Sequence, residues 1–221
     1  MNLTCSGLLI IANLSGITLR PVQPAKPTQT VPSAEKATAA NSMVVVWRDR
    51  PSKRTYQLPQ SIGGKPASFY LNNPKVSPLA KALYTARFRP TDNDSTARLL
   101  ALVTTNDNSI RPFYRWCLDF TITISDGALG EYPGVPALAY ATKFPQEFFA
   151  YMDKDASGQR YKRWVEIIAY SGLSNYNEAK PLIRKGIIED MTKKCQPCSA
   201  ATNQRINRFA KSVVDATKRH Q

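Results

Sequence analysis

The first forty residues contain almost nothing that a folded core could bury. Residues 1–40 hold a single acid, Glu35, and the stretch from Pro21 to Ala40 is built mainly from Pro, Thr, Ala, Ser, Gln and Lys. A segment with so few large apolar side chains cannot offset the conformational entropy that it would lose on folding. We therefore predict a flexible basic arm over residues 1–41, which leaves residues 42–221 to form the fold.

This segment also has features of a targeting sequence. It is poor in acids and rich in hydroxyl residues, as organellar transit peptides are, although Arg is scarce. A secretory signal fits less well, because no Lys or Arg precedes Arg20 and the polar residues Asn13 and Ser15 interrupt the apolar run. We favour a retained arm over both alternatives, and residues 5–19 could then pack on a neighbouring subunit.

Positive charge is the strongest pointer to function. The chain has 30 Lys and Arg against 16 Asp and Glu, a net charge of +14, in 221 residues. Residues 1–57 and 141–221 carry most of the excess, whereas residues 58–140 are nearly balanced. A compact protein of this charge repels itself, and a polyanion would neutralise it. The composition favours nucleic acid or another anionic partner. The alternative is a basic surface that only keeps the protein soluble.

Short strands are expected between residues 42 and 140. The β-branched and aromatic run Met43–Trp47 and the segments Arg54–Leu58 and Ala67–Leu71 are strand candidates. Trp116–Ile124 alternates and is rich in Thr, Ile and Phe, so we expect a central strand there.

Helices are expected elsewhere, above all in the last third. Ser77 and Pro78 predict the start of an amphipathic helix that ends before Pro90, whereas Arg98–Val103 is compatible with helix or strand. Residues 141–221 contain a short aromatic helix over 145–152 and three apolar stripes at helical spacing. The stripes are Tyr161, Trp164, Val165 and Ile168; Ile183, Ile187 and Met191; and Ile206, Phe209 and Val213. The predicted fold is α+β, with short antiparallel strands in the first half and a basic, helical region 141–221 packed on the core of residues 42–140.

Catalytic chemistry finds little support. The only histidine, His220, is the penultimate residue, which disfavours Ser-His-Asp and Cys-His mechanisms, and no glycine-rich nucleotide loop is present. Asp153–Gly158 begins like a calcium loop, but the twelfth position is Trp164, which cannot ligate, so we favour an ordinary turn. We expect a protein that is not an enzyme and that needs no cofactor or metal.

Two cysteines, Cys195 and Cys198, stand in a CxxC arrangement before the last apolar stripe. A single CxxC is a weak signal, and an incidental structural pair is the favoured interpretation. A disulfide or redox-sensitive pair and a metal half-site are the alternatives, with Lys193 and Lys194 favouring the thiolate.

Basic residues interleaved with aromatics form the candidate nucleic-acid site. Arginine supplies a fork of donors for phosphate, and aromatic rings can stack on unpaired bases. Tyr161 and Trp164 are discounted because aromatics at helical spacing more often fill a core. The candidate phosphate-binding residues are Lys81, Arg87, Arg111, Arg115, Arg160, Lys162, Arg163, Arg205, Arg208 and Arg219.

The sequence therefore favours a structural protein that packages nucleic acid, RNA in particular. A viral coat or nucleocapsid-type subunit, located in a virion or host cytoplasm, is the leading hypothesis, and such a subunit would form homo-oligomers. An organellar ribonucleoprotein component and a secreted or surface protein with an anionic partner are the alternatives. No run of apolar residues is long enough to span a bilayer.

Overall fold

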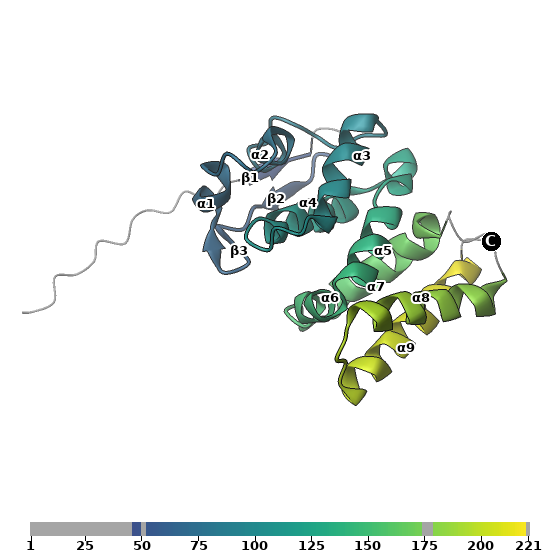
Figure 1. Cartoon of the computed structure of the whole chain (residues 1–221). Coiled ribbons are helices and arrows are strands. Elements are labelled where there is room, and N and C mark those ends of the chain that lie inside the picture. Colours follow the sequence, from purple (N-terminus) through teal and green to yellow (C-terminus); the bar gives the residue numbers. More distant parts are fainter. Residues whose placement is uncertain (1–45, 50–51, 174–178, 220–221) are drawn as a thin grey trace, which may run out of the picture. The chain divides into compact units, whose positions relative to one another are not determined.

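The computed structural model describes residues 46–49, 52–173 and 179–219, and Met43–Gln221 form one compact unit. The predicted arm over residues 1–41 lies outside the described residues. Within them, short strands come first along the chain and helices follow to the C-terminus, as Figure 1 shows. The predicted α+β class, with short antiparallel strands early and a helical last third, is thus confirmed.

Two small antiparallel hairpins supply the strands. β1 (Val46–Arg48) pairs with β2 (Thr55–Gln57), and β3 (Ser61–Ile62) pairs with β4 (Lys65–Pro66). β1 falls in part within the strand expected at Met43–Trp47, whose first three residues are not described, and β2 lies inside the strand expected at Arg54–Leu58. In the first hairpin Trp47 pairs with Tyr56, and Trp47 is buried.

The second hairpin depends on two glycines. Gly63 and Gly64 have φ values of 59° and 81°, in the left-handed region that suits a two-residue hairpin turn and that other residues adopt only at a cost. A Cβ atom at Gly63 would also lie 2.6 Å from Cβ of Pro112, whereas one at Gly64 would meet nothing within 4 Å. The turn therefore packs closely against the start of α4 (Arg111–Ile124) through Gly63 alone.

We expect Gly63→Ala to lower the free energy of unfolding by about 2–3 kcal/mol, because it combines left-handed strain with a steric overlap. Gly64→Ala has the strain without the overlap, so about 1 kcal/mol is expected for it. Urea unfolding followed by circular dichroism measures both values. Equal losses for the two variants would contradict the close packing of Gly63 on Pro112.

Helices account for most of the described residues. Figure 1 shows them following one another from α1 to α9, with α8 and α9 side by side. Their bounds are α1 Ala67–Leu71, α2 Pro78–Tyr84, α3 Asp94–Ala101, α4 Arg111–Ile124, α5 Gly134–Lys143, α6 Pro145–Met152, α7 Gln159–Ile167, α8 Lys180–Lys194 and α9 Ala200–Ala216. Shorter 3₁₀ turns cover Leu102–Thr104, Gly127–Glu131 and Thr217–Arg219, and a π-helical turn, Ile168–Gly172, follows α7.

The expected central strand at Trp116–Ile124 is wrong, because this segment belongs to helix α4. Most side chains of α4 are buried, and its Thr and Ile residues are β-branched, which favours a strand. The helical period is carried by polar residues four positions apart: Arg111, Arg115, Asp119 and Thr123. The hydroxyls of Thr121 and Thr123 donate to the carbonyls of Cys117 and Asp119, four residues earlier, which satisfies them inside the helix.

The strand expected at Ala67–Leu71 is also wrong, since these residues form α1. Ala67 and Tyr70, three residues apart, are the buried positions of this helix. The Tyr70 ring stacks on Phe113 with centroids 4.9 Å apart, and its hydroxyl donates to the carbonyl of Ile62 (2.9 Å). Tertiary packing therefore overrides the strand propensity of the sequence.

Other helices agree with the sequence patterns. Ser77 caps α2 by accepting a hydrogen bond from Leu79 N, and Pro78 occupies the first turn, although α2 ends at Tyr84, earlier than expected. The segment Arg98–Val103, whose sequence is compatible with helix or strand, is helical. The aromatic helix expected over 145–152 is α6, and the three apolar stripes lie on α7 and its π-helical turn, on α8 and on α9.

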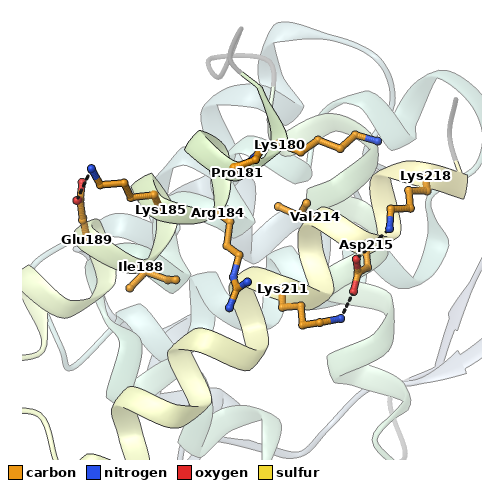
Figure 2. A pocket seen from close by; sticks show the side chains of 10 residues that line it. All are labelled: Lys180, Pro181, Arg184, Lys185, Ile188, Glu189, Lys211, Val214, Asp215 and Lys218. Carbon is orange, nitrogen blue, oxygen red and sulfur yellow. Dashed lines mark hydrogen bonds and ion pairs between the residues drawn. The ribbon is translucent and has the colours of Figure 1, made fainter.

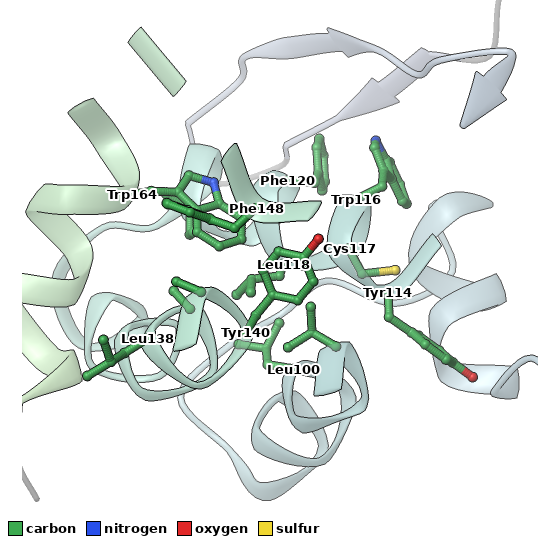
Figure 3. Packing of buried hydrophobic residues seen from close by; sticks show 14 of the residues in the cluster. Leu100, Tyr114, Trp116, Cys117, Leu118, Phe120, Leu138, Tyr140, Phe148 and Trp164 are labelled. Carbon is green, nitrogen blue, oxygen red and sulfur yellow. The ribbon is translucent and has the colours of Figure 1, made fainter. Parts of the chain in front are cut away.

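Aromatic side chains from several helices fill the core around α4. Figure 3 shows Tyr140, Phe148 and Trp164 gathered on one side, while Trp116 and Phe120 lie beside the strands. Trp116 stacks on Phe120 at 5.5 Å, and Phe148 contacts Trp164 with centroids 5.8 Å apart. These side chains of α4, α6 and α7 belong to one hydrophobic cluster.

Within the described part of the chain, every helix is either too short or too polar to cross a membrane.

Candidate nucleic-acid interface

A polar cleft lies where the second hairpin meets α4, α6 and α7. It has a volume of about 390 Å³ and contains three cations and one carboxylate. We call it the Tyr151 cleft. Its lining residues are Pro59, Ser61, Ile62, Gly63, Gly64, Pro112, Arg115, Trp116, Asp119, Tyr151, Lys154 and Arg160.

Two arginines stack on one tyrosine at the centre of this cleft. The Cζ atoms of Arg115 and Arg160 lie 4.2 and 4.4 Å from the centroid of the Tyr151 ring. Arg160 also donates from Nη1 to the Tyr151 carbonyl at 3.0 Å. Guanidinium groups at such distances interact favourably with the ring face, which holds their planes in fixed positions. The cleft therefore presents positive charge and hydrogen-bond donors rather than a free aromatic surface.

Asp119 is the only carboxylate that lines the cleft. It accepts hydrogen bonds from Tyr151 Oη (2.8 Å) and from Trp164 Nε1 (2.7 Å), and its Oδ2 lies 3.3 Å from Nε of Arg160. Burial raises the pKa of Tyr151 well above its usual value, and the Asp119 carboxylate raises it further. The phenol therefore stays protonated and keeps donating to Asp119.

One donor of Arg115 is unsatisfied among the residues that the structure describes. Its Nη1 donates to Glu147 Oε1 (2.8 Å) and to Tyr140 Oη (2.9 Å), but its buried Nε–H has no hydrogen-bond partner among them. A buried donor without a partner costs about 1–3 kcal/mol, so such groups often mark a place where a ligand or water binds. Arg115 also lines the cleft, so its guanidinium contributes positive charge there, although Nε itself is buried.

Lys154 adds an exposed positive charge to the cleft. It lies in the turn between α6 and α7 and is exposed. The neighbouring Asp155 accepts from the Ser157 hydroxyl and from the backbone N–H of Arg160, and these bonds lower its pKa to about 2. Asp155 is therefore ionised at neutral pH and fixes the turn that carries Lys154.

Arg111 and Arg115, two of the predicted phosphate-binding residues, are buried. They lie one turn apart on α4 and pair with the same carboxylate, that of Glu147 on α6, at 2.9 and 2.8 Å. Arg111 also donates to the Thr105 carbonyl (2.8 Å) and stacks on the Phe144 ring. Arg111 is thus a structural residue, and Arg115 reaches the cleft only through its edge.

Three other candidates are paired with acids of the same chain. Arg160 pairs with Asp119, Arg205 with Asp153, and Arg219 with Glu166. The Arg205 guanidinium holds the pKa of Asp153 below its usual value through a side-chain hydrogen bond. These contacts reduce the charge that the three arginines can offer to phosphate, although Arg219 remains exposed.

The remaining candidates stand apart from the cleft. Arg87, Lys162, Arg163 and Arg208 are exposed, and Lys81 is half-buried. Lys162 and Arg163 line a separate hollow beside Tyr170, and Arg208 lines another beside Arg205. The ten candidates therefore fall into separate groups, and the Tyr151 cleft contains only Arg115 and Arg160. Sequence reasoning missed Lys154, Asp119 and the Gly63–Gly64 turn as parts of this site.

The interleaved aromatics are core residues. Tyr84, Tyr114 and Trp116 are buried, and the hydroxyls of both tyrosines bind backbone atoms, the carbonyl of Pro59 and the N–H of Ser77. Burial also raises the pKa of Tyr84 and of Tyr114. These rings therefore stabilise the fold and cannot stack on bases.

The two other motifs have structural roles. Cys195 and Cys198 form a disulfide, with Cα atoms 5.2 Å apart, in the connection between α8 and α9, so neither sulfur is a free thiolate for a metal. Asp153–Gly158 is a turn between α6 and α7. Among the described residues, no group of three or more His, Cys, Asp and Glu could hold a metal ion.

Comparisons with protein-family models, with curated proteins and with solved structures found no match to this chain. Its site is therefore interpreted from its own geometry.

Proposed function

We propose that this protein is a structural subunit that binds RNA through sequence-independent phosphate contacts, as a viral coat or nucleocapsid-type protein does. The Tyr151 cleft carries the proposal. It combines the cationic side chains of Lys154, Arg160 and Arg115 around a space of about 390 Å³. Each of these groups donates to oxygen, and phosphate oxygens are strong acceptors.

The overall charge supports the same function. A net charge of +14 favours a polyanionic partner over a second surface of equal charge, and neutralised phosphates would let several subunits lie along one strand. The cleft offers no free aromatic face and few groups that distinguish bases. Recognition by charge and backbone contacts, without sequence preference, is the mode that this arrangement supports.

Lys154→Gln tests the role of the cleft. Removing one phosphate contact is expected to reduce the slope of log affinity against log salt by about 0.7 for a single strand, without changing which sequences bind. The measurement is fluorescence anisotropy of a labelled oligouridine over a series of NaCl concentrations. Lys193→Gln, at an exposed position on α8 that does not line the cleft, is the matched control.

The proposal predicts that Lys193→Gln keeps more of the wild-type slope than Lys154→Gln. If both variants reduce the slope equally, RNA binding is a property of the general surface charge. If neither variant nor the wild type binds oligouridine, the proposed function is wrong.

A further inference from the structure

A second hollow, distinct from the Tyr151 cleft, lies between α8 and α9. It has a volume of about 580 Å³, and Figure 2 shows its side chains projecting from both helices. We call it the α8–α9 groove. Its aliphatic lining consists of Pro181, Ile188 and Val214, and no aromatic ring contributes to it.

Cations surround this aliphatic floor. The groove is lined by five cationic residues and two carboxylates. The cations on α8 are Lys180, Arg184 and Lys185; Lys211 lies on α9, and Lys218 lies just beyond α9. Glu189 forms an exposed ion pair with Lys185. Asp215 forms exposed ion pairs with Lys211 and Lys218. Exposed pairs of this kind contribute little to stability, so a ligand can exchange with them at little cost.

Arg184 distinguishes the groove from an ordinary charged surface. It is exposed, it extends from α8 toward α9 in Figure 2, and no ion pair with a described residue engages its guanidinium. An unpaired guanidinium beside an aliphatic floor matches a ligand that carries a carboxylate next to apolar side chains.

We propose that the α8–α9 groove binds an acidic amphipathic helix of a partner protein. The apolar side chains of that helix would pack on Ile188 and Val214, and its Glu or Asp side chains would pair with Arg184 and the flanking lysines. A groove between two helices is a common seat for a third helix, which anchors through residues at i, i+3, i+4 and i+7.

Charge disfavours the other simple occupants. Residues 1–40 of this chain hold one acid, so that segment does not complement the groove. A second copy carries the same net charge of +14, so it complements the cations of the groove less well than an acidic helix does. A nucleic acid complements the charge but not the aliphatic floor, and its phosphates would meet Glu189 and Asp215. The partner therefore differs in class from the RNA of the proposed function.

The test uses the full chain and a labelled synthetic peptide with Leu on one helical face and Glu on the other. A scrambled peptide of the same composition is the control ligand. Arg184→Glu is expected to weaken binding of the amphipathic peptide at least about fivefold, because a favourable charge pair becomes a repulsive one. Ile188→Ala is expected to weaken it at least about threefold through lost apolar contact.

Lys193→Glu, the same charge change on α8 outside the groove, is the matched control and should leave peptide affinity within about twofold. Circular dichroism verifies that each variant is folded. The proposal would be overturned if the chain bound the scrambled peptide as tightly as the amphipathic one. It would also be overturned if Lys193→Glu weakened peptide binding as much as Arg184→Glu does. Displacement of the peptide by oligouridine, with Arg184→Glu weakening both ligands alike, would assign the groove to RNA instead and would also overturn it.

Discussion

Replacing Glu147 by alanine is expected to lower the free energy of unfolding by about 3 kcal/mol, because two buried guanidinium groups lose their shared carboxylate. Arg111 and Arg115 are 7% and 5% exposed, and both pair with Glu147 at less than 3 Å. The side chain of Glu147 is 30% exposed, so water offsets part of the loss and the lower end of the usual range for a buried pair applies.

Glu147→Gln separates charge from hydrogen bonding. Glutamine can still accept from Tyr140 and one arginine, so we expect a loss of about 2 kcal/mol rather than 3. Glu131→Ala removes an exposed glutamate and should change the free energy of unfolding by no more than about 0.5 kcal/mol. Urea titration followed by circular dichroism measures all three. A loss below 1 kcal/mol for Glu147→Ala would show that the two arginines are hydrated rather than held by this carboxylate.

Trp164→Ala is expected to be the most damaging single change in the core, with a loss of about 4 kcal/mol in the free energy of unfolding. Trp164 is fully buried, packs against Phe148 and Tyr140, and donates from Nε1 to Asp119 at 2.7 Å. The substitution creates a cavity among α4, α6 and α7 and also leaves an acceptor of Asp119 without its donor.

Trp164→Phe retains much of the ring and loses the indole donor, so an intermediate loss of about 2 kcal/mol is expected. Leu182→Ala, at a side chain that is 50% exposed on α8, should cost no more than about 0.5 kcal/mol. The same urea titration compares them. A Trp164→Ala variant as stable as Leu182→Ala would contradict the packing seen in Figure 3.

Three helices could be predicted from the sequence, but the most buried helix was mistaken for a strand. The buried residues of α7, α8 and α9, among them Trp164, Ile187 and Phe209, recur at helical spacing. α4 is mostly buried, and its Thr and Ile residues are β-branched, so local propensity favoured a strand. Its polar residues Arg111, Arg115, Asp119 and Thr123 recur every four positions, which is the spacing of a helix.

The same error concealed the role of two arginines. Once Arg111–Ile124 is known to be a buried helix, Arg111 and Arg115 stand one turn apart on it and must share an acid from elsewhere in the chain. Their spacing was visible in the sequence, but the partner, Glu147, lies more than thirty residues away. Lys154 was overlooked because Asp153–Gly158 was considered as a calcium loop or an ordinary turn, and not as part of a phosphate-binding site.

The central claim, that this protein binds RNA without sequence preference through phosphate contacts, is tested most directly by the salt dependence of affinity in the unaltered chain. If Lys154 and Arg160 alone neutralise phosphates, affinity for oligouridine should fall about sevenfold between 50 and 200 mM NaCl, and more steeply with each further contact. An oligonucleotide of unrelated sequence should show the same dependence of log affinity on log salt concentration. Affinity that does not change with salt, or that is confined to one sequence, would contradict the claim.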